Sequence, residues 1–160
     1  MSNIRPFAPM HIALESPDQP DVIELIAELD AYQRSLYPPE STHLLDVAYL
    51  TQAHVLFAVA RDAEQRAVGC GAVVLHADYG ELKRMYVHPR GRGQGVATAM
   101  LALLESNAVS AGCRLLKLET GPLQPEALGL YARHGFERRA PFGGYRDDPL
   151  SVFMQKRLRI

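Results

Sequence analysis

A glycine-rich run in the second half of the chain has the composition of an anion-binding turn. Residues 90–97 read Arg-Gly-Arg-Gly-Gln-Gly-Val-Ala and lie between a predicted strand and a predicted helix. Glycines let the backbone approach a ligand closely, and the first turn of a helix presents N–H groups that have no partner within the helix. These groups lie at the positive end of the helix dipole, so such turns bind phosphate groups. The run therefore predicts a cradle for a pyrophosphate, with Arg90 and Arg92 adding positive charge at its edge.

The spacing of these glycines differs from that of the two commonest nucleotide-binding loops. A dinucleotide fingerprint needs G-x-G-x-x-G, and neither the frame that starts at Gly91 nor the one at Gly93 reaches a third glycine. A Walker A loop needs Gly-Lys-Ser/Thr after four spacers, and the sequence holds no such run. A purely structural tight turn and a nucleotide-binding oxidoreductase stay open as alternatives, and titration with NAD(P) tests the second.

The histidines and cysteines form no pattern that suggests a metal site or a nucleophile. The six histidines show no ligand spacing with cysteine or carboxylate, and H-E-x-x-H does not occur. Cys70 lies in an apolar run and Cys113 follows a predicted helix end, so we expect both to be buried small hydrophobes. We therefore expect no metal ion and no covalent intermediate on a cysteine. Unpaired cysteines and a first segment unlike a secretory signal favour a cytoplasmic location.

Hydrophobic periodicity places the glycine-rich run in one mixed α/β domain that spans residues 1–160. Three consecutive strands joined by short loops predict an antiparallel meander, and the strand–helix–strand order from Glu81 to Thr120 predicts a parallel crossover. The predicted helices are 21–36, 42–50, 96–111 and 125–134, and the predicted strands are 10–14, 55–60, 68–75, 81–87, 115–120, 136–138 and 151–158.

Two segments resemble the signature motifs of the GNAT superfamily of N-acetyltransferases. Residues 92–97 match R/Q-x-x-G-x-G/A, and residues 127–136, Ala-Leu-Gly-Leu-Tyr-Ala-Arg-His-Gly-Phe, match A-x-x-L-Y-x-x-x-G-F. Each motif lies on the expected element, and the resemblance covers about Gly80 to Phe136. The first third of the chain shows only generic similarity, and that part usually determines the acceptor in this superfamily.

Three other segments resemble a bacterial branch that is sometimes labelled indole acetate acetyltransferase. They are Leu118 to Gly121, Phe142 to Tyr145 and Ser151 to Met154. The sequence leaves the acceptor open.

The resemblance implies acetyl-CoA as cosubstrate, bound where two neighbouring parallel strands splay apart. These would be the strands that end at Val87 and at Thr120, in a sheet with N-terminal antiparallel strands, flanked by helices. The pantetheine arm is then expected to pair with the unpaired backbone near Val87 as an added strand does. Many members have asparagine where Gln124 stands. The implied cofactor contacts are Met85, Tyr86, Val87, Arg92, Gly93, Gln94, Gly95, Val96, Ala97, Thr98 and Gln124.

The resemblance also implies a general acid and a general base. Tyr131 is the expected acid, since a phenol stays protonated at neutral pH and can donate to the departing sulfur. Glu81 is the preferred base and Glu119 the second choice. As alternatives, Tyr131 is a packed helix tyrosine, and the two carboxylates are structural partners of nearby lysines or arginines. A backbone N–H near Val87 is expected to polarise the carbonyl as an oxyanion hole does.

Composition limits the partners of this predicted enzyme. The 160 residues carry a net charge of −1 with a pI of about 6.6, which gives no strong positive field for nucleic acid or an anionic membrane. We therefore expect a small-molecule primary amine as the acceptor, direct attack in a ternary complex, and a possible homodimer. The alternative is a non-catalytic acyl-CoA-binding sensor of the same fold.

Overall fold

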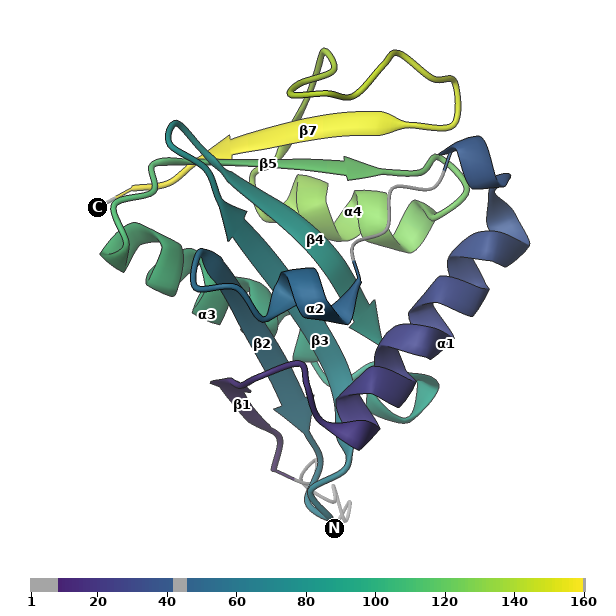
Figure 1. The fold of residues 1–160 in the computed structure, drawn as a ribbon, viewed down its shortest axis with the longest axis vertical. Coiled ribbons are helices and arrows are strands. Elements are labelled where there is room, and N and C mark those ends of the chain that lie inside the picture. Colours follow the sequence, from purple (N-terminus) through teal and green to yellow (C-terminus); the bar gives the residue numbers. More distant parts are fainter. Residues whose placement is uncertain (1–8, 42–45, 160) are drawn as a thin grey trace, which may run out of the picture.

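The computed structural model describes residues 9–41 and 46–159, which form one seven-stranded sheet (Figure 1). The strands are β1 (His11–Leu14), β2 (Val55–Arg61), β3 (Ala67–Leu75), β4 (Gly80–Val87), β5 (Leu115–Thr120), β6 (Glu137–Arg139) and β7 (Val152–Arg157). Their order in the sheet is β1-β2-β3-β4-β5-β7-β6. Only the β4–β5 pair is parallel among the pairs of described strands. The predicted antiparallel meander and the predicted parallel crossover are therefore both confirmed.

Helices cover both faces of this sheet. They are α1 (Pro20–Leu36), α2 (Val47–Leu50), α3 (Val96–Ser110) and α4 (Pro125–Arg133), with short 3-10 turns η1 (Pro39–Ser41) and η2 (Pro89–Gly91). Apolar residues of α1 and α2 pack with Phe57 and Val59 of β2. Apolar residues of α3 and α4 pack with Ala58, whose side chain points to the opposite face because strand residues alternate.

Apart from the start of the second predicted helix, the element ends agree with the predicted ones or differ from them by one residue. Arg61 belongs to β2 and not to the following turn, and the last strand is shorter at both ends. The helix predicted over 42–50 is observed only as Val47–Leu50, since residues 42–45 lie outside the described part. Asp46 caps this turn by accepting a hydrogen bond from the Tyr49 amide at 2.8 Å. Among the described residues, no helix combines the length and the apolar character that a membrane span requires.

A bulge in β4 explains why this strand separates from β5. The pairing of β3 with β4 shifts register between Cys70 and Ala72, where β4 contributes one extra residue. Arg84 lies in that stretch with φ 61°, a left-handed conformation that is rare for a residue other than glycine. Such bulges bend a strand and increase its twist. Strand β5 accordingly pairs with β4 only from Gly80 to Leu82, and Figure 1 shows the two strands diverging beyond this point.

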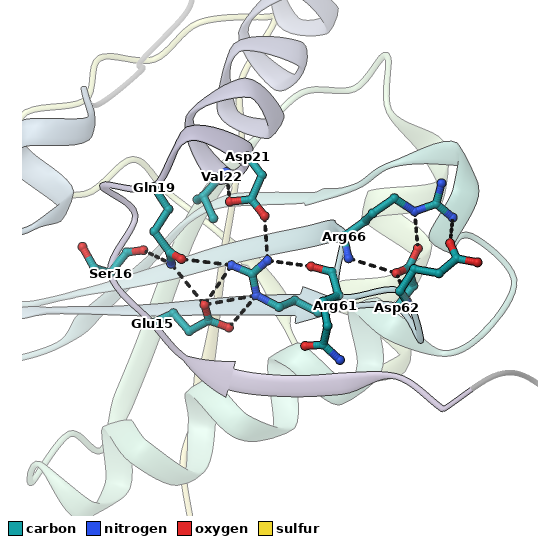
Figure 2. Close-up of polar contacts among 10 residues, drawn as sticks. Glu15, Ser16, Gln19, Asp21, Val22, Arg61, Asp62 and Arg66 are labelled. Atoms are coloured by element: carbon teal, nitrogen blue, oxygen red, sulfur yellow. Dashed lines mark hydrogen bonds and ion pairs between the residues drawn. The ribbon is translucent and has the colours of Figure 1, made fainter.

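Arg61, the last residue of β2, joins the sheet to the start of α1 (Figure 2). Its guanidinium donates to both oxygens of Glu15, to Asp21 Oδ2 at 2.6 Å and to the Gln65 carbonyl at 2.9 Å. These bonds hold the pKa values of Glu15 and Asp21 below their usual range. A depressed carboxyl pKa contributes stability at neutral pH that is lost as the pH falls through the folded-state pKa. The cluster therefore stabilises the fold, and its contribution to the free energy of unfolding is smallest in acid.

Candidate active site

Two cavities meet where β4 and β5 separate. The larger, about 460 Å³, is lined by the end of β4, the glycine-rich turn, the first turn of α3 and one side of α4. The smaller, about 90 Å³, lies among α1, η1, β4 and β5. Four residues line both cavities, so the two volumes adjoin at these side chains: Met85, Gln124, Ala127 and Tyr131.

The glycine-rich turn is shaped by backbone conformation and not by packing. Gly93 and Gly95 have φ values of 75° and 72°, and a Cβ atom on either would meet no atom within 4 Å. Gly95 is the N-cap of α3, so the first N–H groups of that helix follow it directly. The space beside the turn is open, and its glycines are required for the left-handed backbone. This open backbone arrangement is compatible with the anion cradle expected from the sequence, and the binding of a pyrophosphate there stays a prediction.

The predicted cofactor contacts gather around the larger cavity. Every one of them lines it except Gln94, whose Nε2 donates to the Arg90 carbonyl at 3.1 Å. Arg92 joins the turn to β4, since its Nε donates to the Val87 carbonyl at 3.1 Å. Tyr32 of α1 and Arg133 of α4 also line the cavity, and neither was predicted from the sequence.

Tyr131 lies at the boundary between the two cavities. It comes from α4, is 7% exposed, and stacks edge-to-face on Phe136 with ring centroids 5.5 Å apart. Burial raises the pKa of its hydroxyl above the ordinary value, so the phenol is protonated at neutral pH. The packed helix tyrosine of the alternative is therefore observed, and the role of general acid stays a prediction for a residue that borders both cavities.

Glu119 lines the smaller cavity from β5. Burial raises the pKa of its carboxyl to about 7. The neighbouring Ser151 hydroxyl and the Lys83 charge oppose this shift, and the charges of Glu81 and Asp148 support it. A carboxyl with this pKa exchanges its proton near neutral pH, which is the property of an efficient general base.

Glu81 lines the same cavity but is held in a network of neighbours. The Tyr145 hydroxyl donates to Glu81 Oε2, and Lys83 Nζ lies 3.4 Å from that oxygen and 2.8 Å from the Tyr145 hydroxyl oxygen. His76 Nε2 is 3.9 Å from Oε1. The alternative in which Glu81 pairs with Lys83 is therefore observed.

Tyr145 reaches this network from a segment that the sequence analysis left without a role. Its ring packs on Phe142 and Phe153, with ring centroids 5.1 and 5.5 Å away. The Phe-Gly-Gly-Tyr run over 142–145 was the available signal, since two aromatic residues around a flexible turn suggest an anchored loop. Nothing local in the sequence pointed to Glu81 as its partner.

Within 9–41 and 46–159, no group of three or more histidine, cysteine or carboxylate side chains is arranged to hold a metal. Both cysteines are buried, and burial raises the pKa of the Cys70 thiol to about 12. A thiol with such a pKa carries almost no thiolate at neutral pH and is a poor nucleophile.

Comparison with known proteins gives a consistent family. The sequence model described as the acetyltransferase (GNAT) family matches residues 22–136. A relative from Azospirillum brasilense named IAA acetyltransferase is 47% identical over 149 residues, which cover 92% of this chain and 97% of the relative. The uncharacterized N-acetyltransferase YsnE of Bacillus subtilis is 34% identical, covering 93% of this chain and 100% of its own.

Solved structures agree with these sequence relatives. A crystal structure of a proposed acyl-CoA N-acyltransferase from Klebsiella pneumoniae is 39% identical with a TM-score of 0.80, covering 94% of this chain and 98% of its own. The PaiA N-acetyltransferase of Thermoplasma acidophilum, solved in complex with coenzyme A, has a TM-score of 0.71 over 93% of this chain and 99% of its own; at 17% identity it shows the shared fold alone. The chain is therefore an acyltransferase that belongs to the acetyltransferase (GNAT) family.

Proposed function

We propose that the protein transfers the acetyl group of acetyl-CoA to a primary amine of a small molecule, by direct attack in a ternary complex. The observation that carries this proposal is the meeting of the two cavities at Tyr131, with Glu119 on the acceptor side. A carrier in the larger cavity and an amine in the smaller one would face each other across the gap between β4 and β5.

The larger cavity has the features that coenzyme A requires. The open glycine turn and the first N–H groups of α3 suit a pyrophosphate. The edge of β4 beyond Leu82 is not paired with β5 and offers backbone groups to an amide-bearing arm. When bound, acetyl-CoA supplies an acyl group that a thioester activates for attack by nitrogen.

We assign the base to Glu119 in preference to Glu81. Glu119 has a pKa of about 7, whereas Glu81 already accepts hydrogen bonds from Tyr145 and Lys83. In the proposed reaction Glu119 takes a proton from the ammonium group, and the freed nitrogen forms a C–N bond as the C–S bond breaks. Tyr131 donates its hydroxyl proton to the departing sulfur, the second proton of the attacking nitrogen then restores the phenol, and Glu119 releases the proton it took to solvent.

The acceptor is proposed to be a small molecule because the smaller cavity measures only about 90 Å³. Its described lining includes Ser41, Gln33 and Leu150 beside the charged residues, so one polar group with a short apolar part would fit. The names of the curated relatives support acetyl as the transferred group.

Release of free thiol tests this function. We expect the purified chain to liberate coenzyme A from acetyl-CoA only when a suitable primary amine is present, with one acetylated amine formed for each thiol. A panel of small amines followed by a thiol reagent and mass spectrometry measures both products. Binding of acetyl-CoA without turnover on any amine would favour the sensor alternative, and binding of NAD(P) in place of coenzyme A would favour the oxidoreductase.

The assignment of Tyr131 predicts a loss of turnover without a loss of carrier binding. Tyr131→Phe keeps the packed ring but removes the proton donor, so we expect kcat to fall by about 10²-fold. The dissociation constant for acetyl-CoA should change by less than about twofold, because the hydroxyl is not part of the anion cradle. Calorimetric titration and steady-state kinetics measure the two quantities, and an unchanged melting temperature shows that the fold is intact. Equal turnover would remove Tyr131 from the mechanism.

A further inference from the structure

We infer that Tyr37 is a positioning residue that holds Gln124 at the boundary between the two cavities and so links the acceptor side of the site to the carrier side. The inference rests on the proposed function, since it concerns how coenzyme A is held. Tyr37 follows the last residue of α1 and lines the smaller cavity, whereas Gln124 lines both.

The Tyr37 hydroxyl forms hydrogen bonds with the loop between β5 and α4. It accepts a hydrogen bond from the Leu123 amide at 3.2 Å and donates one to Gln124 Oε1 at 3.3 Å. The side chain is 5% exposed, so these bonds are shielded from water. Figure 1 shows the C-terminal end of α1 beside this loop. Two segments more than 80 residues apart in sequence are thus joined through one hydroxyl group.

Gly121 is what allows the tyrosine to come this close. A Cβ atom on Gly121 would lie 1.7 Å from the Tyr37 hydroxyl oxygen and 2.1 Å from Cζ. Its φ is outside the left-handed region, so the requirement is one of space and not of backbone conformation. Any side chain at this position would push the ring away from the loop.

The position of Gln124 gives this contact its functional meaning. Gln124 is the N-cap residue of α4, and Tyr131 follows seven residues later, two helical turns along the same side. Because the Tyr37 hydroxyl occupies Oε1, the amide is oriented and Nε2 is left as its donor end. Fixing this amide therefore places a donor beside the carrier and sets the first turn of the helix that carries the proposed acid.

The charges around Tyr37 are compatible with this role. Burial raises the pKa of its hydroxyl, and the nearby Glu119 carboxylate acts in the same direction. The phenol is therefore protonated at the pH at which the enzyme is proposed to work, and it can donate to Gln124.

A double-mutant cycle on coenzyme A binding tests the inference. We expect Tyr37→Phe to weaken the binding of coenzyme A to the full chain by about fivefold, and Gln124→Ala to weaken it by a similar factor. Because the hydroxyl acts through the Gln124 amide, the double variant should bind no more weakly than Gln124→Ala alone. In kinetics, the KM for acetyl-CoA should rise by more than kcat falls. Calorimetric titration with coenzyme A is the measurement.

Tyr49→Phe is the matched control, since it removes a hydroxyl that lies 3.1 Å from His54 Nε2, away from both cavities, and should leave the affinity unchanged. Three results would overturn the inference: Tyr37→Phe binds like the wild type, its effect adds in full to that of Gln124→Ala, or Tyr49→Phe weakens binding as much. If the wild-type chain itself fails to bind coenzyme A, the proposed function and the inference fall together, and this outcome is distinct from the other three.

Discussion

Glu119→Gln is expected to lower kcat by about 10³-fold, the largest catalytic effect of any single substitution in this site. Glutamine keeps the size and the hydrogen-bonding shape of the side chain but cannot accept a proton from the ammonium group. In the wild type, activity should rise as the pH increases through about 7 and then level off, because the base acts only in its deprotonated form. Steady-state kinetics between pH 5.5 and 9 would show this rise in the wild type and its absence in the variant.

Glu81→Gln is the control for this prediction, since it changes the other carboxylate of the same cavity. Its loss breaks the contacts with Tyr145 and Lys83, so we expect a smaller fall in kcat, of about tenfold, with the rise near pH 7 retained. If Glu81→Gln removed the pH dependence and Glu119→Gln kept it, the two roles would have to be exchanged.

The thermal stability of Glu119→Gln provides a second test of the role of this carboxyl. The folded-state pKa of Glu119 lies above the ordinary value of 4.5, so this carboxyl favours folding when it is protonated, and that contribution is lost as the pH rises through about 7. A shift of this size corresponds to up to about 3 kcal/mol. Glu119→Gln should therefore melt several degrees higher than the wild type at pH 8 and close to it at pH 4. If Glu119→Gln is inactive but more stable than the wild type, the Glu119 carboxyl serves catalysis and not the stability of the fold.

Features that depend on local backbone conformation were readable from the sequence. The glycines at 93 and 95 were selected for their spacing, and both have the left-handed conformation that glycine favours. Tyr131 was selected from a motif on one helix, and the structure places it where the two cavities adjoin. In these cases a few neighbouring residues carry all the information.

The bulge that opens the site could not be read in this way. Lys83 and Arg84 are ordinary residues for a half-polar strand. Their residue types do not indicate the positive φ that is observed at Arg84. The strained residue is held by the surrounding fold, in which Arg84 pairs with Asp30 of α1. Such conformations persist where distant contacts determine them.

The choice between the two carboxylates depended on contacts of the same long-range kind. Glu81 was preferred as base because of its position in the motif region, but Tyr145 lies 64 residues further along the chain and occupies one of its oxygens. The pKa of Glu119 follows from burial, which a strand-end glutamate does not reveal in a single sequence. The same reason explains why Tyr37 was missed, since its partners lie in the loop before α4.

Gly95→Glu is expected to abolish measurable binding of coenzyme A, which corresponds to a rise of more than about 100-fold in the dissociation constant. Two effects combine at this position. A residue other than glycine at φ 72° strains the turn by roughly 1–2 kcal/mol. The carboxylate would also lie at the N-terminus of α3, where it would occupy the N–H groups proposed for the pyrophosphate and repel its charge. Calorimetric titration with coenzyme A measures the loss.

Gly112→Glu separates the two effects, because the same change is made just beyond the other end of the same helix. Gly112 has φ 89°, and a Cβ atom there would meet no atom within 4 Å, so the backbone strain and the open surroundings are matched. It does not line the larger cavity, whose walls are formed by the opposite end of α3. Gly112→Glu should therefore lose at least as much thermal stability as Gly95→Glu, since its carboxylate lies at the negative end of the helix dipole, while only Gly95→Glu loses coenzyme A. If Gly95→Glu bound coenzyme A as the wild type does, the turn would be no more than a structural bend, and the carrier would have to be held elsewhere.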